Sequence, residues 1–340
     1  YMRAGQLVQA TENYERALHI NHVNDGFYNL EQFPLRDGLT ESYRSQNDLD
    51  KANFHQAAQL QIMEHRVGKG SPELLPALSK LAGWYERTGQ MYSARLVHQD
   101  TARLIAAGKG ENDPALVEPL IAIASGYRLQ AMQAPTADPM QGPETLLPMS
   151  SVVLRKALGI IDQQPEPDPL QRARVLVEFG DLYLIWGKRN SSAEAYADAW
   201  RALSGNDDLA AQRDEYFARP VRLYWSPAPP VYPASAARLP ASIKLEPGHV
   251  VVSFAVDASG RVSSADVLES DPVGLMDKNV LNAVRRSLYR PRHVDGAAVP
   301  TAGLSPRHDY GYRLEAREAA PPEPAESNKP LAQPGSDSRN

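Results

Sequence analysis

The sequence predicts a mainly α-helical chain, in which a solenoid of helical hairpins is followed by a small α+β domain and a disordered tail. Three observations predict this order. Identical residues recur every 42 residues in the first half, which is typical of a helical repeat. After Pro220 the spacing changes to the alternation of β-strands, and the last residues are mostly proline and polar side chains. We expect repeats at 1–205, a linker at 206–221, an α+β domain at 222–315 and a tail at 316–340.

Tyrosines and alanines carry the repeat. The two clearest series are Tyr1, Tyr43, Tyr85 and Tyr127, and Ala10, Ala52 and Ala94. Between Leu74 and Tyr85 the apolar residues lie three or four apart, which places them on one helix face. Gly89 and Gly108 then end successive helices. Each unit is therefore predicted to be a helical hairpin, with small residues where two helices meet and tyrosines between neighbouring hairpins.

We expect a half unit at the start, two intact hairpins, an interrupted hairpin at about 115–163 and a final hairpin at about 169–203. A proline-rich loop at 134–148 is predicted to interrupt the hairpin at about 115–163. Two patterns resemble the tetratricopeptide repeat (TPR), in the 42-residue spacing of kinesin light chain: Gly5, Ala10, Tyr14 and Ala17, and Gly180, Tyr183, Gly187, Tyr196 and Ala199. The resemblance covers residues 1–205.

The TPR resemblance implies a concave face, lined mainly by the first helix of each hairpin, that binds a partner protein. The charged residues expected beside the tyrosines on this face are Glu41, Arg44, Glu86, Arg87 and Arg128. They are either solvated surface charges or the side chains along which an extended peptide lies. Both interpretations are open at this stage.

The α+β domain is predicted from alternation and from one amphipathic helix. An alternating run ends at the turn Asp257–Gly260, which predicts a β-hairpin. A helix is expected at 275–288, a turn at Asp295 and Gly296, and a last strand at 308–314. This order predicts a small antiparallel sheet with one helix packed on it.

Four segments in the right order are similar to the TonB C-terminal domain, over residues 222–315: PPVYP (229–233), the VVVSFAVDASGRV hairpin, LMDKNVLNAVRRSLYRPR (275–292) and VDGAAV (294–299). The resemblance implies a periplasmic domain that adds an extended peptide of an outer-membrane transporter to a sheet edge. By position, the implied binding residues are Pro230, Tyr232, Pro233, Tyr310, Tyr312 and Leu314. Tyr232 and Tyr310 are alternatively residues that cover the small core.

Other classes of function find no support in the sequence. The chain has no cysteine, which excludes disulfides, thiolate metal sites and cysteine nucleophiles. The histidines are not spaced for a metal site, and the Gly-Lys-Gly segments at 68–70 and 108–110 recur at one point of the repeat and are expected to be turns. We expect no cofactor and no enzyme activity. The net charge of −5 argues against nucleic acid, and no apolar segment is long enough to cross a membrane.

The predicted function is a non-enzymatic, protein-binding adaptor of the bacterial cell envelope. One alternative is a TonB-family energy transducer for outer-membrane transport, whose membrane anchor lies upstream of Tyr1, because Tyr1 lies inside a repeat. A second alternative is a structural scaffold that self-associates, for example as a homodimer. The junction at 204–221 is predicted to be either helical or loose.

Overall fold

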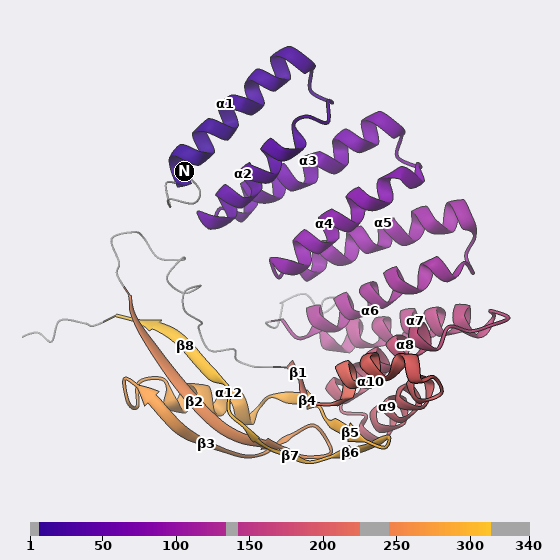
Figure 1. The fold of residues 1–340 in the computed structure, drawn as a ribbon, viewed down its shortest axis with the longest axis vertical. Coiled ribbons are helices and arrows are strands. Elements are labelled where there is room, and N and C mark those ends of the chain that lie inside the picture. Colours follow the sequence, from indigo (N-terminus) through magenta and orange to yellow (C-terminus); the bar gives the residue numbers. More distant parts are fainter. Residues whose placement is uncertain (1–6, 134–141, 225–244, 314–340) are drawn as a thin grey trace, which may run out of the picture.

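The computed structural model describes residues 7–133, 142–224 and 245–313. A stack of helical hairpins leads into an α+β domain that projects from the last hairpin to one side of the stack (Figure 1). The predicted fold class is therefore confirmed for these parts of the chain. Nothing in the described ranges bears on the predicted disordered tail.

The stack begins with one helix and continues with paired helices. The helices are α1 (Leu7–Asp25), α2 (Phe33–Ser45) with α3 (Leu49–Val67), α4 (Leu75–Arg87) with α5 (Met91–Lys109), α6 (Val117–Ala131) with α7 (Pro143–Asp162), and α8 (Pro169–Ile185) with α9 (Arg189–Ser204). Short 3₁₀ turns, Pro72–Leu74 and Pro114–Leu116, precede α4 and α6. The half unit, the two intact hairpins, the interrupted hairpin and the final hairpin lie where the repeat predicted them.

Helix ends follow from local chemistry. The side chains of Asp48 and Asp168 accept hydrogen bonds from backbone N–H groups at the start of α3 and α8. Gly68 and Gly110, with φ of 87° and 97°, end α3 and α5 in a region that disfavours other residues. The first Gly-Lys-Gly segment is thus a turn between hairpins, as predicted, and in the second Lys109 still belongs to the last turn of α5.

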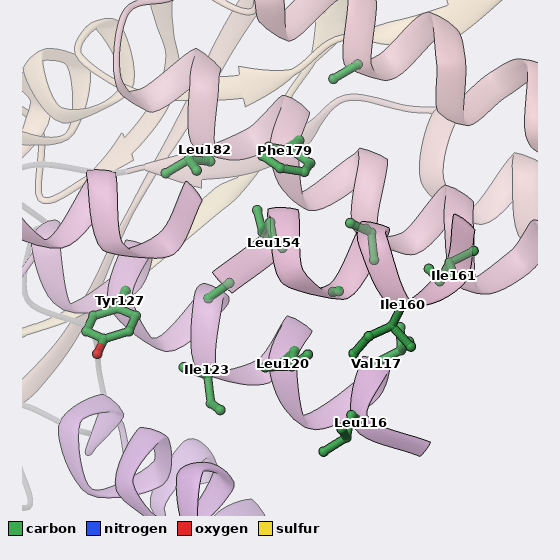
Figure 2. Packing of buried hydrophobic residues seen from close by; sticks show 14 of the residues in the cluster. Leu116, Val117, Leu120, Ile123, Tyr127, Leu154, Ile160, Ile161, Phe179 and Leu182 are labelled. Atoms are coloured by element: carbon green, nitrogen blue, oxygen red, sulfur yellow. The ribbon is translucent and has the colours of Figure 1, made fainter. Parts of the chain in front are cut away.

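The core of the stack lies between neighbouring hairpins. Its largest cluster joins α6, α7 and α8, and Figure 2 shows side chains of this cluster on these helices, among them Leu120, Leu154 and Phe179. Tyr43 and Tyr127 are buried in the stack, as the repeat predicted.

Small residues lie where paired helices approach, and the predicted alanine series continues as serine. Ala52 and Ala94 are buried in α3 and α5. Ser192 follows Gly180 at the interval at which Ala94 follows Ala82, and its Oγ donates to the Gly180 carbonyl at 2.8 Å. Ser150 Oγ likewise donates across the third hairpin, to the Ala124 carbonyl at 2.8 Å.

The predicted loop at 134–148 is shorter than expected. Its second half belongs to α7, which begins at Pro143 and contains Pro148. Proline at the first helical position is tolerated because the N–H it lacks has no partner within the helix. Residues 134–141 lie outside the described ranges.

The junction between the two domains is helical. It contains a 3₁₀ turn (Asp207–Leu209), α10 (Ala210–Phe217) and the first residue of strand β1 (Val221–Tyr224). Phe217 is fully buried, with its ring 5.6 Å from Trp200 and 6.2 Å from Tyr196. The segment predicted as a linker therefore packs against α9.

The α+β domain is built around one long central strand, β2. Its elements are β2 (Glu246–Val256), β3 (Val262–Asp271), α12 (Asp277–Arg285), β4 (Leu288–Arg290), β5 (Arg292–Val294), β6 (Ala297–Val299), β7 (Thr301–Leu304) and β8 (Arg307–Tyr312). Strand β3 pairs with one side of β2, and β7 and β8 pair with the other, all antiparallel. Two further pairs, β1 with β4 and β5 with β6, were not predicted.

Alternation in β2 follows the prediction. Val250, Val252, Phe254 and Val256 are buried and form the domain core with Val280 and Val284 of α12. The helix is shorter than expected and ends at Arg285, because the residues from Leu288 form β4. The turn at Asp295 and Gly296 is present, with positive φ at both residues.

Replacing Ala52 by leucine should lower the free energy of unfolding by about 1–3 kcal/mol, because Ala52 is fully buried in the core cluster with Leu39 and Leu81. Gln61→Leu, at an exposed position of the same helix α3, is the control and should change it by less than about 0.5 kcal/mol. Urea denaturation followed by circular dichroism measures both. Equal stability of the two variants would contradict the packing described here.

Candidate protein-interaction surfaces

The predicted groove residues occupy equivalent positions of successive first helices. Arg44, Glu86 and Arg128 each follow their tyrosine directly, in α2, α4 and α6. The fourth member of this row is Leu184, which follows Tyr183 in α8. The structure therefore places the three predicted residues in one row along the stack, but it does not expose all of them.

Arg44 and its neighbour Glu41 are exposed and paired with each other. Arg44 Nε donates to Glu41 Oε2 at 2.8 Å, one helical turn away. An exposed pair of this kind contributes little to stability, so both side chains are free to change partner. Glu86 and Arg87 are also exposed, at the end of α4.

Arg128 is buried, contrary to the prediction that it is exposed in the groove. Its side chain is 8% exposed, and its Nε and Nη2 donate to the two carboxylate oxygens of Glu178 at 2.5 and 3.1 Å. Glu178 comes from α8, so no pattern within α6 could indicate this partner. Burial by itself lowers the pKa of Arg128, but the carboxylates of Glu178 and Asp181 outweigh it and raise the pKa overall. The guanidinium therefore stays charged as part of the structure.

A cavity of about 360 Å³ lies between α4, α5, α6 and α8, next to this ion pair. Of the predicted groove residues, Glu86 lines it, with its Oε1 2.7 Å from His98 Nε2. Arg174 and Glu118 line it from the other side as a second pair, at 2.6 Å. The remaining lining residues are Met91, Ala94, Arg95, Ile121, Ala122, Ser125, Gly126, Leu129 and Glu178.

Arg95 brings a cation to this cavity that the sequence reasoning missed. Its guanidinium carbon lies 4.2 Å from the centre of the Tyr127 ring, and its Nε donates to Gln130 Oε1 at 3.3 Å. Gly126 makes this possible, because a Cβ there would come within 3.0 Å of the Arg95 side chain. The cavity therefore combines apolar walls with fixed charges.

At the other end of the molecule, β8 lies at an edge of the sheet. Within the described ranges β8 pairs with β2 alone, so its outer side has no strand beside it. Such an edge presents backbone N–H and C=O groups to which another strand can add. Arg307 and Asp309, which pair with each other at 2.7 Å, are the charged residues of this strand.

The aromatic residues predicted to bind peptide at this edge differ in exposure. Tyr310 is 1% exposed and packs on Gly248, where a Cβ would lie 2.7 Å from its ring. Tyr310 is therefore not accessible at the edge, and its burial in the domain core agrees with the alternative that it covers the core. Tyr312 is half-buried. The other predicted residues, Pro230, Tyr232, Pro233 and Leu314, lie outside the described ranges.

Between the two surfaces, Arg290 of β4 meets Asp181 of α8. Arg290 Nε and Nη2 donate to the two oxygens of Asp181 at 2.9 and 2.7 Å, and Tyr196 OH donates to the same carboxylate at 2.8 Å. The signal that could have indicated this contact is the presence of Glu178 and Asp181 in the otherwise apolar segment 175–185.

Residues 228–306 match the family described as Gram-negative bacterial TonB protein C-terminal. The second domain resembles the TonB C-terminal domain. The match confirms the resemblance that the sequence segments predicted, and it concerns this domain and not the whole chain. We call residues 221–313 the TonB-like domain from here on.

Two solved structures similar to the chain are the TPR-like repeats of a kinesin light chain from Podosopora anserina and BtubC from P. vanneervenii. The first is 15% identical, covers 61% of this chain and 92% of its own, and has a TM-score of 0.44. The second is 14% identical, covers 63% of this chain and 78% of its own, and has a TM-score of 0.40. No curated protein sequence matches the chain.

The described residues contain neither a metal-binding cluster nor a membrane-spanning helix. No cluster of three or more histidine, aspartate or glutamate side chains there could hold a metal ion. None of the helices described is both long and apolar enough to cross a membrane.

Arg128→Met should lower the free energy of unfolding by about 3–5 kcal/mol, because it leaves the Glu178 carboxylate buried without its cation. Arg103→Met, which removes an exposed arginine paired with Asp100, should change it by less than about 0.5 kcal/mol. Urea denaturation measures the difference. If Arg128→Met is as stable as the control, Arg128 is a surface residue after all.

Proposed function

We propose that the chain is a non-enzymatic, protein-binding adaptor of the bacterial cell envelope. In this proposal the concave face of α2, α4 and α6 holds one protein segment, and the edge of β8 takes up an extended segment by strand addition. The observation that carries the proposal is the combination, in one chain, of a helical-repeat stack with a domain that matches the Gram-negative TonB C-terminal family.

The chemistry of the two surfaces supports binding rather than catalysis. The charged groups around the groove cavity pair with one another, Glu86 with His98 and Glu118 with Arg174. Charges at a binding surface contribute to the orientation of a bound segment and to the exclusion of wrong partners more than to affinity. The β8 edge supplies backbone hydrogen bonds, which give affinity with little demand on sequence. The envelope location rests on the family that the TonB-like domain matches.

A capture experiment tests the proposal. The immobilised full-length chain is incubated with a Gram-negative envelope extract, and retained proteins are quantified by mass spectrometry against a column that carries an unrelated protein. A reproducibly retained envelope protein is then purified, and its affinity is measured. If no envelope protein is retained above the unrelated column, the adaptor function is wrong. If the chain retains only its own copies, it is the self-associating scaffold.

The edge prediction uses Asp309. Val252 N–H donates to the Pro306 carbonyl, so in this antiparallel register the Asp309 N–H faces away from β2. Asp309→Pro removes this outward donor and should weaken strand addition by about tenfold or more. Asp309→Ala removes the same carboxylate but keeps the N–H group, so it is the matched control and should bind within about threefold of the parent. Affinity for the captured partner, or the dimerisation constant, measures the effect. Equal losses in both variants would mean that the carboxylate binds the partner and not the strand edge.

The groove prediction uses the exposed charges. Arg44→Glu combined with Arg87→Glu should slow association with an acidic partner by about threefold to tenfold at low salt, because these charges steer the encounter. Arg128 is unsuitable for this test because it is buried. Arg103→Glu, also exposed but on the second helix α5, is the control. Surface plasmon resonance at two salt concentrations gives the rates. Unchanged rates in the double variant favour the interpretation of solvated charges.

A further inference from the structure

The last hairpin does not present a free concave face, because the TonB-like domain covers it. When α8 is aligned with α6 on their tyrosines, Asp181 and Leu184 of α8 occupy the positions of Ser125 and Arg128 of α6. Asp181 holds Arg290 of β4. Leu184 lies against the β2–β3 turn, where a Cβ on Gly260 would approach its side chain to 3.0 Å. The row that carries the predicted groove residues in α2, α4 and α6 therefore holds the chain's own second domain in α8.

Arg290 is held by hydrogen bonds to the last hairpin and to α10, in the way expected of a ligand in the groove. Its guanidinium forms two parallel hydrogen bonds to one carboxylate, and its Nη1 donates to the Tyr216 carbonyl at 3.3 Å. The side chains of Arg290 and Asp181 are 9% and 3% exposed, so water competes little with the pair. This bidentate geometry fixes direction as well as distance. The Tyr196 hydroxyl completes the shell around Asp181.

Two more contacts fix the domain around this pair. The His293 ring lies 5.4 Å from the ring of Tyr196 and 4.8 Å from that of Phe217, in edge-to-face arrangements. Gly296, at a φ of 80°, lies under Trp200, where a Cβ would come within 3.1 Å of the indole ring. Together with Arg290 these contacts are spread over β4, β5 and the β5–β6 turn. Contacts from separate elements prevent rotation about any one of them.

We propose that Arg290 is an internal ligand of the solenoid, which locks the TonB-like domain onto the concave face of the last hairpin and makes the two domains one rigid body. Without Arg290, Asp181 would be a buried carboxylate one helical turn from Glu178, with Arg128 as the nearest cation. Domains in one chain move relative to each other by default, unless their interface is large and hydrophobic. In this interface the buried ion pair lies beside the aromatic contacts of His293 and Trp200. Here the bonded interface holds them.

The consequence for binding depends on the proposed function. Figure 1 shows the sheet and the stack enclosing an open angle, with α2, α4 and α6 along one side and β8 along the other. A locked interface keeps the free groove and the sheet edge at a fixed separation. If one partner chain reaches both surfaces, its second contact forms within an existing complex. The overall affinity is then higher than that of either contact alone.

Spin-label distance measurements test the lock on the full-length chain. Cysteines introduced for Gln61 of α3 and Ser264 of β3, both exposed, are the unique labelling sites because the chain has no cysteine of its own. We expect one narrow distance distribution in the parent protein. Arg290→Met should broaden it by about twofold or more, as the domains gain independent motion. Calorimetry of the same variant should resolve two unfolding transitions in place of one.

Arg201→Met removes an exposed arginine paired with Asp198 on α9 and should leave the distribution unchanged. If Arg290→Met does not fold, Arg290→Lys keeps the charge but loses the two-point contact, and it should broaden the distribution to a smaller degree. A broad distribution in the parent, or a narrow one in every folded Arg290 variant, overturns the proposal. Neither result affects the capture of a partner protein. The spin-label experiment can therefore reject the interdomain lock without rejecting the adaptor function.

Discussion

Two carboxylates one turn apart on α8, Glu178 and Asp181, organise the second half of the molecule. Both are buried, and a buried carboxylate without a cation is strongly destabilising. Arg128 reaches Glu178 from the preceding hairpin, and Arg290 reaches Asp181 from the sheet. Each arginine donates through its Nε and Nη2 to both oxygens of its carboxylate, so each pair sets an orientation. Helix α8 is thereby the element to which both the preceding hairpin and the second domain are fixed.

The regular parts of the fold could be predicted because local patterns decide them. The tyrosine spacing located the hairpins, and the alternation from Val250 to Val256 located the central strand, because a helix or strand face repeats at a fixed interval. Alanine at the close approach of paired helices was also predictable. Its replacement by Ser150 and Ser192 was not, because a serine hydroxyl can bond a helix carbonyl as well as water.

The errors concern residues whose neighbours are distant in sequence. Arg128 has the pattern of a surface residue, and its burial depends on Glu178, 50 residues later. Tyr310 looked like an edge residue, but Gly248 on β2 leaves a space that its ring fills. Arg290 stands two residues after the predicted helix, at a place where an exposed charge is ordinary. Tertiary partners that no periodic pattern marks decide each of these positions.

The hairpins of the solenoid differ in the contacts that would be lost if one of them were duplicated or deleted. Hairpins α2–α3 and α4–α5 join each other through recurring apolar side chains, such as Leu39 and Leu81, and through exposed or neutral pairs, such as Lys80 with Asp37. The block from α6 onward adds buried ion pairs to its apolar core, Arg128 with Glu178 and Asp181 with Arg290. Loss of a hairpin within the first group breaks exposed or neutral pairs, whereas the same event within the second separates a buried charge from its partner. A lineage of such chains would therefore vary in length on the N-terminal side of α6 and keep its C-terminal block constant.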